Sequence, residues 1–410
     1  MDKKKIWIVT ELFYPEETAV AYIFTRIAHY LSNSYKVKVI CGPEFYDNNK
    51  KGFVDDLNIS GEIEIFRTKS PNLNKNSLIQ RTFKIIILSL RMGFLMCTKI
   101  SKGETVLLAT NPAPLLIIVR IIQSFKKFQL HILIHDVFPE NTIPAKIFKD
   151  DKSIIFKSIK YLFDNAYSCA DHLIVIGRDM KEIISTKVNR FKTPPSISVV
   201  TNWSNPEKAS LENCNTNRTN KIIIQYAGNI GRVQGIIELL DAFRLSNNEG
   251  LCLNFRGTGA LHSYIESYIT KYNLANIHLD GGFSRNEEND ILANCDIGIV
   301  SLSQGMYGLG VPSKSYHLLS AGKPILFIGE PKTEISLMVS ENGIGWSLDI
   351  SDQNELIAFF NQLSSIDRGI LIEMGRKAGQ LANIQYNEPT ILKLLQTEIE
   401  SIKYKLPDQC

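Results

Sequence analysis

The chain has 410 residues, of which 44% are hydrophobic and 21% charged, and its formal net charge is +4. This composition is typical of a soluble globular protein and excludes disordered and collagen-like chains, while the length exceeds that of one usual hydrophobic core. The seven cysteines are scattered and form no C-x-x-C pair, which argues against a disulfide framework or a zinc site and favours a reducing compartment.

Apolar runs rich in Val and Ile alternate with helical patterns along the first half of the chain. The runs predict β-strands at residues 6–10, 37–41, 63–67, 105–110, 130–136, 172–177 and 196–202. A helix is expected at residues 19–31. Such alternation predicts a parallel sheet covered on both faces. Because the apolar run after the basic start is short, we interpret it as the first strand rather than a signal peptide.

The polar stretch 204–220 is typical of a linker, and the same alternation restarts after it. Strands are expected at 221–228, 251–259, 276–282, 296–302 and 324–329, with a helix at 235–245. We therefore expect an α/β protein with two doubly wound, Rossmann-like domains, residues 1–203 and 204–387, facing a central cleft. The last segment, 388–410, could cross back to the first domain as a helix. Ligands of such sheets bind beyond the carboxyl ends of the strands.

Positive charge is concentrated in one window of the first half. Between Arg67 and His135 there are eleven Lys and Arg residues and one acid, Glu104, so the window carries +10 and the rest of the chain −6. This asymmetry predicts that the first half binds an anionic surface or an anionic substrate. The window contains no nucleic-acid-binding motif. Residues 82–100 lack an uncharged apolar run long enough to span a membrane. They fit a helix at a membrane interface, or a core helix whose charges face outward. Its charged residues are Lys84, Arg91 and Lys99.

The stretch GVPSKSYHLLSAGKP, residues 310–324, follows an expected strand. Ser313 after Pro312 is a good N-cap and predicts that a helix begins there. A helix N-terminus beside the end of a parallel strand offers free N–H groups and a positive dipole end, to which Lys314 adds a full charge. This combination suits a diphosphate, although an ordinary capped helix of an α/β sheet has the same pattern.

The turn YAGNIGRVQG, residues 226–235, is a second candidate for ligand binding. Gly228 and Gly231 let the backbone approach a ligand closely, and Arg232 is placed for a phosphate oxygen. The spacing differs from that of the dinucleotide fingerprint. A glycine-rich turn with a solvated arginine would look the same. Together with the helix at Ser313, the turn could hold a nucleotide diphosphate without a metal.

Two further motifs follow strands of the first half. HDVFPE, residues 135–140, places an imidazole and two carboxylates at a strand exit, where His135 or Asp136 could bind sugar hydroxyls or assist proton transfer. LFYPEETAV, residues 12–20, places Glu16, Glu17 and Thr18 at the mouth of the expected cleft, on the acceptor side. A solvated exit loop and the polar N-cap region of a helix are the alternative interpretations.

These four motifs, in this order, resemble those of the retaining GT-B glycosyltransferases of family four. The subgroup builds bacterial surface polysaccharides such as O-antigen and capsule and includes fucosamine transferases. The resemblance covers nearly the whole chain and is stronger in the second half. It implies that the turn approaches the donor diphosphate. The implied donor-binding residues are Gly228, Asn229, Gly231, Arg232, Gln234, Ser313, Lys314, Tyr316 and His317. The implied catalytic residues are His135, Asp136, Arg232 and Lys314.

The chain departs from the family pattern at three positions. Relatives commonly carry a lysine where this chain has Gln234, and two glutamates where it has Leu309 and His317. Lys314, within the PSK-x-Y pattern of the subgroup, could replace the missing positive charge, and His317 could take over the ribose contact.

We therefore expect a metal-independent glycosyltransferase without a cofactor. As the resemblance implies, it would move a sugar from a UDP-sugar, such as UDP-L-FucNAc or another N-acetylated hexosamine, to a polyprenyl-linked glycan with retention. It would be cytoplasmic and peripheral at the anionic inner face of the bacterial plasma membrane. A UDP-N-acetylhexosamine epimerase-like enzyme and a non-catalytic sugar-binding scaffold are the alternatives. The basic apolar window argues against the epimerase, and the missing glutamates leave the scaffold open.

Overall fold

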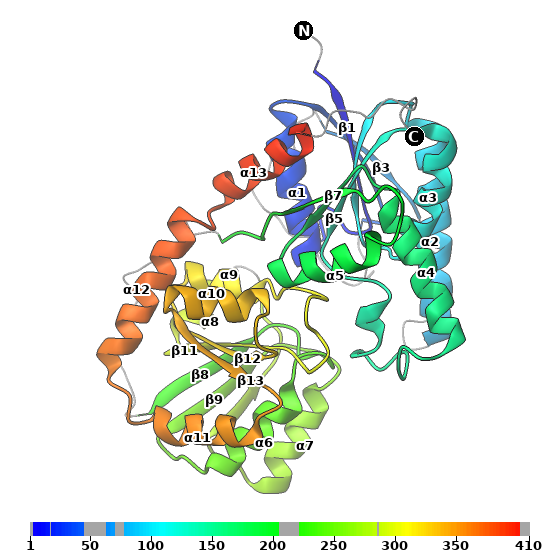
Figure 1. Cartoon of the computed structure of the whole chain (residues 1–410). Helices are drawn as coiled ribbons and strands as arrows, with labels where there is room; N and C mark the ends of the chain where they lie inside the picture. The colour runs from blue at the N-terminus through cyan, green and yellow to red at the C-terminus, as the bar shows by residue number, and fades with distance from the viewer. Residues whose placement is uncertain are drawn as a thin grey trace.

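The computed structural model describes residues 3–16, 18–44, 63–69, 78–204, 221–284 and 287–401. They form two parallel sheets, one in each half of the chain, with helices on both faces (Figure 1). All twelve strands expected from the sequence are present, so the predicted pair of doubly wound domains is confirmed. The predicted linker beyond Ser204, and the last helix beyond Ser401, lie outside the described residues.

The N-terminal sheet has seven strands in the order β3-β2-β1-β4-β5-β6-β7. Its strands are β1 (Lys5–Thr10), β2 (Lys36–Cys41), β3 (Glu64–Arg67), β4 (Thr105–Ala109), β5 (Gln129–Ile134), β6 (His172–Val175) and β7 (Ser196–Val199). The central strands are continuous apolar runs because both of their faces are buried. One face packs against α1 (Ala19–Ser32) and α13 (Glu388–Ser401). The other packs against α2 (Leu78–Lys99), α3 (Pro114–Lys126), α4 (Ile154–Ser168) and α5 (Arg178–Val188), with the turn η1 (Glu140–Thr142) nearby (Figure 1).

The C-terminal sheet has six strands in the order β10-β9-β8-β11-β12-β13. They are β8 (Ile222–Ala227), β9 (Leu251–Arg256), β10 (Ile277–Asp280), β11 (Ile297–Ser301), β12 (Ile325–Gly329) and β13 (Gly345–Asp349), the last of which the sequence analysis did not predict. The helices that flank this sheet are α6 (Ile236–Ser246), α7 (His262–Tyr272), α8 (Glu288–Ala293), α9 (Lys314–Ser320), α10 (Glu334–Asn342), α11 (Gln353–Leu363) and α12 (Arg368–Ile384). Helix α11 packs on α6, and α12 packs on α9.

The chain crosses between the domains twice, and the two crossings lie side by side. The amide of Ser204 donates to the carbonyl of Tyr386 at 2.7 Å. Beyond this point α13 returns to the N-terminal domain and packs on α1, where Glu388 accepts from Arg26 and Glu400 accepts from the hydroxyl of Tyr35. The last helix therefore lies against the first domain, as its place in Figure 1 shows.

The loop after β11, residues 302–313, joins the two domains. Its Leu309 carbonyl accepts from the amide of Val137 at 3.1 Å, and Gly310 forms an isolated bridge with Asp136. Both partners follow β5, so the carboxyl ends of the two sheets face each other across the junction. No helix in the described part of the chain is long and apolar enough to cross a membrane.

Candidate functional site

Lys314, in the first turn of α9, reaches toward the turn that follows β8. Its Nζ lies 3.5 Å from the ring centroid of Tyr226, and a Cβ added at Gly228 would lie 3.7 Å from Cε and Nζ of Lys314. The amine is buried and has no hydrogen-bond partner among the described residues. Burial lowers the pKa of Lys314 to about 7. The structure thus brings together the two segments that the sequence predicts to bind a diphosphate.

The turn after β8 is held in place by its own hydrogen bonds. The hydroxyl of Tyr226 donates to the carbonyl of Asn229 at 2.6 Å, and lies 3.3 Å from Oε1 of Gln234. Gly228 has a φ of +126°, which L side chains rarely adopt, and a Cβ at Gly231 would lie 2.8 Å from the side chain of Asn229. Gln234 therefore supports the aromatic ring beneath Lys314, at the position where the resemblance described above implies a second positive charge.

Arg232 lies on the same turn, at the surface. Its side chain is exposed and forms no ion pair with the residues that the structure describes. The turn thus carries an exposed guanidinium at Arg232, and the buried, unpaired amine of Lys314 lies against it at Gly228.

Ser313 occupies the N-cap position of α9, as the sequence predicts, but its backbone angles are helical and its hydroxyl makes no capping bond. The hydroxyl of Ser315 instead donates to the carbonyl of Pro312 at 2.7 Å. Tyr316 is fully buried and its ring packs against Tyr386 at a centroid distance of 5.5 Å. Tyr316 is therefore a core residue and does not face a donor, because its position on α9 points it into the domain.

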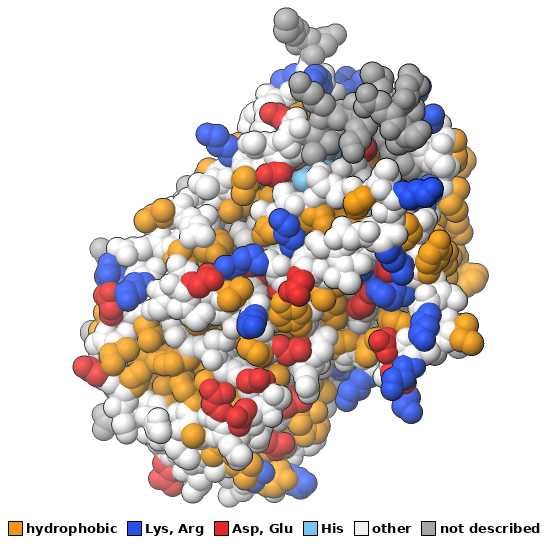
Figure 2. Space-filling view, viewed as in Figure 1, with side chains coloured by type: hydrophobic (Ala, Val, Ile, Leu, Met, Phe, Trp, Pro, Cys, Tyr) orange, Lys and Arg blue, Asp and Glu red, His pale blue; other side chains and the backbone are white. Residues whose placement is uncertain are grey.

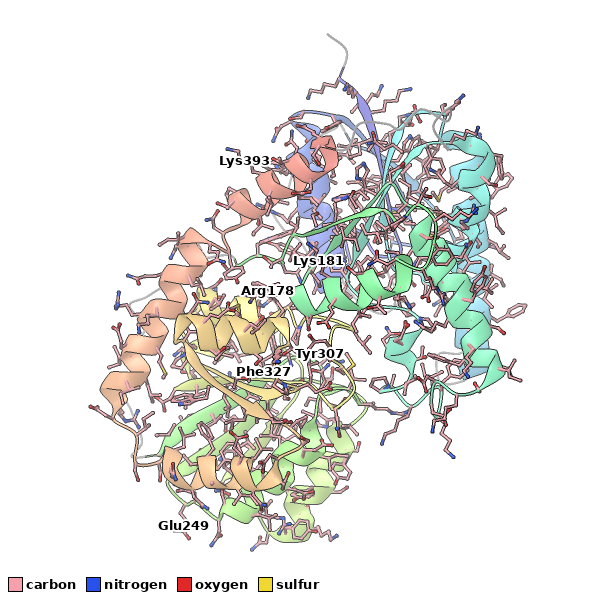
Figure 3. The ribbon with its side chains drawn as sticks, in the orientation of Figure 1. Arg178, Lys181, Glu249, Tyr307, Phe327 and Lys393 are labelled. Carbon is pink, nitrogen blue, oxygen red and sulfur yellow. The ribbon has the colours of Figure 1, made fainter. Side chains whose placement is uncertain are left out.

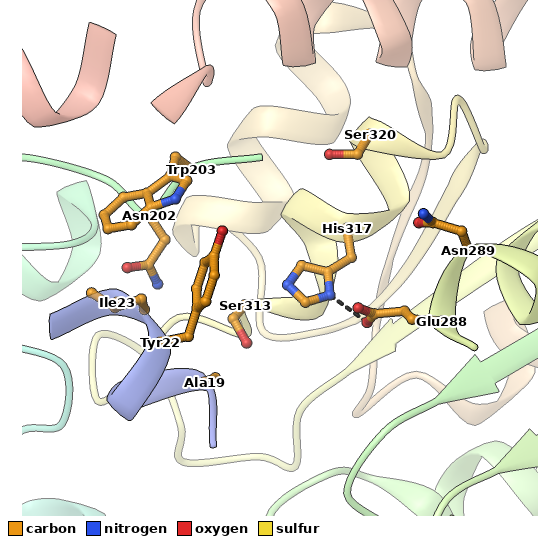
Figure 4. Close-up of a pocket in the computed structure, with 10 residues that line it drawn as sticks. All are labelled: Ala19, Tyr22, Ile23, Asn202, Trp203, Glu288, Asn289, Ser313, His317 and Ser320. Carbon is orange, nitrogen blue, oxygen red and sulfur yellow. Dashed lines mark hydrogen bonds and ion pairs between the residues drawn. The ribbon is translucent and has the colours of Figure 1, made fainter. Parts of the chain in front are cut away.

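A pocket lies between α1, the segment after β7, and the helices α8 and α9 (Figure 4). It is lined by Ala19, Tyr22, Ile23, Asn202, Trp203, Glu288, Asn289, Ser313, His317 and Ser320. His317 and Ser313 come from one face of α9, and Tyr22 lies opposite them on α1. Nδ1 of His317 is hydrogen-bonded to the carboxylate of Glu288. His317, which stands where the resemblance implies a glutamate, therefore has a carboxylate from α8 next to its imidazole.

Sequence reasoning missed eight of the ten lining residues, among them Asn202 and Trp203. Asn202 is the last residue of the expected strand at 196–202 and Trp203 follows it, so the rule that ligands lie beyond strand ends could have identified them. Tyr22 and Glu288 lie within helices, and Asn289 beside Glu288, where no local pattern in the sequence distinguishes them from ordinary surface residues.

His135 and Asp136 lie at the end of β5, near the loop that joins the domains. The ring of His135 lies 5.6 Å from that of Phe24, and its buried Nε2 has no hydrogen-bond partner among the described residues. Burial lowers the pKa of His135 to about 4, so the imidazole is neutral near pH 7. Asp136 accepts from the side-chain amide of Asn111 at 3.1 Å, and burial raises its pKa. A neutral imidazole can still donate or accept one hydrogen bond.

The remaining carboxylate of the HDVFPE motif has a structural role. Glu140 pairs with Lys187 at 2.5 Å and with Lys160, and both lysines also contact the buried Asp164. This network ties the loop after β5 to α4 and α5. It fixes the backbone that carries His135 and Asp136 at the junction of the domains.

The expected acceptor-side residues have separate positions. Thr18 is the N-cap of α1, and its hydroxyl accepts from the amide of Ala21 at 3.3 Å. Glu16 is buried, with 8% of its surface exposed. Glu17 lies outside the described residues. Leu309, at the other position where relatives carry a glutamate, is buried in the contact between the domains. Within the described ranges, no group of three or more His, Cys, Asp or Glu side chains could hold a metal ion.

Comparisons with known proteins identify relatives of this architecture. A scan against protein-family models finds no match. The chain is 36% identical over 307 residues to the "Probable glycosyltransferase WbjE" of Pseudomonas aeruginosa, which covers 73% of this chain and 76% of that protein. The sucrose-phosphate synthase of Thermosynechococcus elongatus has a TM-score of 0.74 at 12% identity, with 97% and 99% of the two chains covered. Anabaena Alr3699/HepE in complex with UDP has a TM-score of 0.69 at 13% identity, with 97% and 100% covered.

Proposed function

Because the chain belongs to the same glycosyltransferase family as WbjE and has the GT-B fold, we propose that it transfers a sugar from a UDP-sugar to a lipid-linked glycan. The observation that carries this proposal is the buried, unpaired amine of Lys314 beside the glycine turn at Gly228. A buried amine without a partner is costly, and an anionic ligand compensates this cost. The neighbour HepE was solved in complex with UDP. The diphosphate of UDP is an anion that could pair with the amine of Lys314.

The diphosphate of the donor binds between Lys314 and the turn after β8. The backbone at Gly228 can approach a phosphate closely because the glycine has no side chain, and Lys314 supplies a positive charge from the other side. Arg232 adds a second cation at the surface of the turn, and a guanidinium can bind phosphate oxygens in a bidentate manner. This arrangement needs no metal ion.

In the transfer step, the bond between the anomeric carbon and the diphosphate oxygen breaks while the acceptor hydroxyl forms the new bond. Lys314 and Arg232 stabilise the negative charge that develops on the departing diphosphate. A phosphate oxygen of the donor takes the proton of the acceptor hydroxyl on the same face of the sugar, so the configuration is retained. The neutral His135 and the carboxyl of Asp136 hold sugar hydroxyls by hydrogen bonds.

The nucleoside part of the donor is recognised in the pocket beside α9. The His317–Glu288 pair offers a nitrogen and carboxylate oxygens to ribose hydroxyls, the role that relatives give to a glutamate. Tyr22 and Trp203 come from the N-terminal domain, so a bound nucleotide would contact both domains.

The acceptor side has a surface that suits a membrane. Large apolar side chains are exposed along α2, α3 and α4 and the loop before α4, at Phe83, Ile86, Leu90, Phe94, Ile121, Phe125, Ile147, Ile154, Ile155, Tyr161 and Leu162. These helices adjoin one another on one face of the sheet, and Figure 2 shows apolar and basic side chains along that edge of the molecule. A patch of this extent, flanked by Lys and Arg, binds the surface of an anionic bilayer. This surface supports the proposal that the enzyme works at the inner face of the bacterial membrane on a polyprenyl-linked acceptor.

The test is the thermal stability of the purified protein with a panel of nucleotides, each with and without a chelator. Selective stabilisation by UDP or a UDP-sugar, unchanged by the chelator, is the expected result, because a ligand of the folded state raises the melting temperature. Hydrolysis of UDP-GlcNAc, UDP-glucose and UDP-L-FucNAc then ranks the sugars. A protein that binds UDP but neither hydrolyses nor transfers any sugar would be a scaffold, and the absence of any nucleotide response would contradict the donor site.

A further inference from the structure

A groove lies between the end of β3 and the outer side of α2, away from the pocket of Figure 4. It is lined by Arg67, Thr68, Lys69, Leu90, Arg91, Phe94 and Leu95, and we call it the β3–α2 groove. The three cationic side chains are exposed, and no carboxylate among the described residues lines the groove. A guanidinium nitrogen of Arg91 donates to the carbonyl of Lys69, which joins the two walls.

The apolar wall of the groove continues into the exposed stripe of α2. Leu90 and Phe94 are 57% and 68% exposed and line the groove, and Phe83 and Ile86 extend the same helical face toward the start of α2. Residues spaced by three or four positions share one face of a helix. A hydrocarbon chain lying along this stripe would thus end at a group of three cations.

The cationic wall also connects to the cleft. A guanidinium nitrogen of Arg67 donates to the carbonyl of Tyr14, in the loop after β1. This loop leads to the N-terminus of α1, where Ala19 lines the pocket that also contains His317. A headgroup bound in the groove therefore lies at the same edge of the sheet as the cleft.

Resting on the proposed function, we propose that the β3–α2 groove binds the diphosphate of the lipid-linked acceptor. Three cations without a carboxylate match a diphosphate better than the single phosphate of a phospholipid, and arginine binds phosphate oxygens in a bidentate manner. The isoprenoid chain lies against Leu90 and Phe94, and the attached glycan extends toward the cleft. The recognised ligand class is an isoprenoid diphosphate.

The experiment measures the binding of farnesyl diphosphate by calorimetry, with UDP present in excess so that the donor site is occupied. Lys69→Gln and Arg91→Gln each remove one charge from the groove, and each should weaken binding about tenfold. Arg67 is left unchanged because its guanidinium also supports the loop after β1. The matched control is Lys157→Gln, which removes an exposed charge from α4 outside the groove. All three variants must melt like the wild type.

Farnesyl monophosphate and inorganic pyrophosphate should each bind more weakly than farnesyl diphosphate, because the proposed ligand needs both the diphosphate and the hydrocarbon chain. Equal binding by the monophosphate, or equal binding by monomeric short-chain phosphatidylglycerol, which forms no bilayer, would show a general anionic surface and overturn the proposal. So would unchanged affinity in Lys69→Gln and Arg91→Gln. Failure of the proposed function is distinguishable, because it would appear as a lack of UDP binding in the wild type while the effects of the groove variants persist.

Discussion

The amine of Lys314 lies 3.5 Å from the ring centroid of Tyr226, with no hydrogen-bond partner among the described residues. The ring face offers some compensation through a cation–π contact, but it cannot accept the hydrogen bonds of an ammonium group. The site therefore stores an unfavourable interaction that an anion would relieve. Replacing such a residue should therefore raise the stability of the free protein and lower its affinity for the ligand.

Replacing Lys314 by Met should raise the melting temperature of the free protein and weaken UDP binding. Removal of an unpaired buried amine stabilises the fold by about 1–3 kcal/mol, while the loss of a charge-assisted contact to the diphosphate should weaken UDP binding about 100-fold. The matched control is Lys323→Met at the other end of α9, whose Nζ donates to the carbonyls of Ala293 and Cys295. That variant should lose stability and keep its affinity for UDP. Thermal melts and calorimetry measure both effects, and unchanged UDP affinity in Lys314→Met would contradict the assignment.

The lowered pKa of Lys314 predicts a dependence on pH. In the unfolded chain the amine has its ordinary pKa of 10.5, whereas burial lowers the pKa to about 7 in the folded protein. Between these values the unfolded chain binds more protons, so the contribution of Lys314 to stability falls as the pH falls from 10.5 to 7. Lys314→Met should remove this slope. Unfolding by urea at several pH values measures it, and an identical slope in both proteins would contradict the prediction.

The same group should take up a proton when the donor binds. At pH 8 the free amine is mostly neutral, and a diphosphate favours its charged form, so binding of UDP should take up a large part of one proton. Calorimetry in buffers of different ionisation enthalpy measures this number. The uptake should be absent in Lys314→Met and unchanged in Lys323→Met. Uptake that persists without Lys314 would assign the proton to another group.

Much of the fold could be predicted from the sequence, because most buried parallel strands are continuous apolar runs. The exception is β13, whose sequence GWSLD mixes glycine, serine and aspartate at the edge of the second sheet. The edge strands β3, β7 and β10 keep enough apolar residues to be predicted, so the polar composition of β13, and not its edge position alone, removes the signal. The sequence could place the motifs at strand ends but could not show which side chains meet there.

The errors within α9 have a clear physical origin. The buried residues of this helix include Ser315, Tyr316, Leu318 and Leu319, whereas Lys314 and His317 are only half-buried and lie toward the turn after β8 and the pocket, respectively. Helical periodicity alone would therefore have assigned Tyr316 to the core. The resemblance to a family motif favoured a binding role for every residue of the motif, although only one face of the helix can meet a ligand. The pairing of His317 with Glu288 is a tertiary contact between two helices and has no local signal.

The His317–Glu288 pair should discriminate ribose from deoxyribose. We expect the wild type to bind UDP about tenfold more tightly than 2′-deoxy-UDP, because one hydrogen bond to the hydroxyl is lost. His317→Ala and Glu288→Gln should each remove most of this difference, and the double variant should lose no more than either single one, because the pair acts as a unit. His278→Ala, an exposed histidine on β10, is the control. If His317→Ala still bound UDP more tightly than 2′-deoxy-UDP, the His317–Glu288 pair would not be the group that binds the ribose.

The apolar face of α2–α4 should bind anionic vesicles. The triple variant Phe83→Ser, Phe125→Ser and Ile155→Ser removes one exposed apolar side chain from each helix, outside the β3–α2 groove. Its affinity for vesicles containing phosphatidylglycerol should fall about 100-fold, since each of the three side chains loses burial worth about 1 kcal/mol. The matched control, Ile372→Ser with Ile384→Ser, removes exposed apolar side chains from α12 and should bind as the wild type does. Sedimentation with vesicles measures binding, and equal losses in both variants would indicate a non-specific effect.

The contact between the domains should depend on Arg178, which lies at their junction, as does Tyr307 (Figure 3). Its guanidinium binds Glu334 at 3.0 Å and Glu341 at 2.9 Å, both in α10 of the other domain. Because Glu334 is buried, Arg178→Ala leaves a buried carboxylate without its cation, and we expect a loss of about 1–2 kcal/mol in stability. The radius of gyration from X-ray scattering should rise as the domains separate, and UDP should partly restore the compact form by contacting both domains. Arg376→Ala, which removes an exposed ion pair within α12, is the control and should leave the scattering curve unchanged. An unchanged radius in Arg178→Ala would show that the loop after β11 holds the domains together without this ion pair.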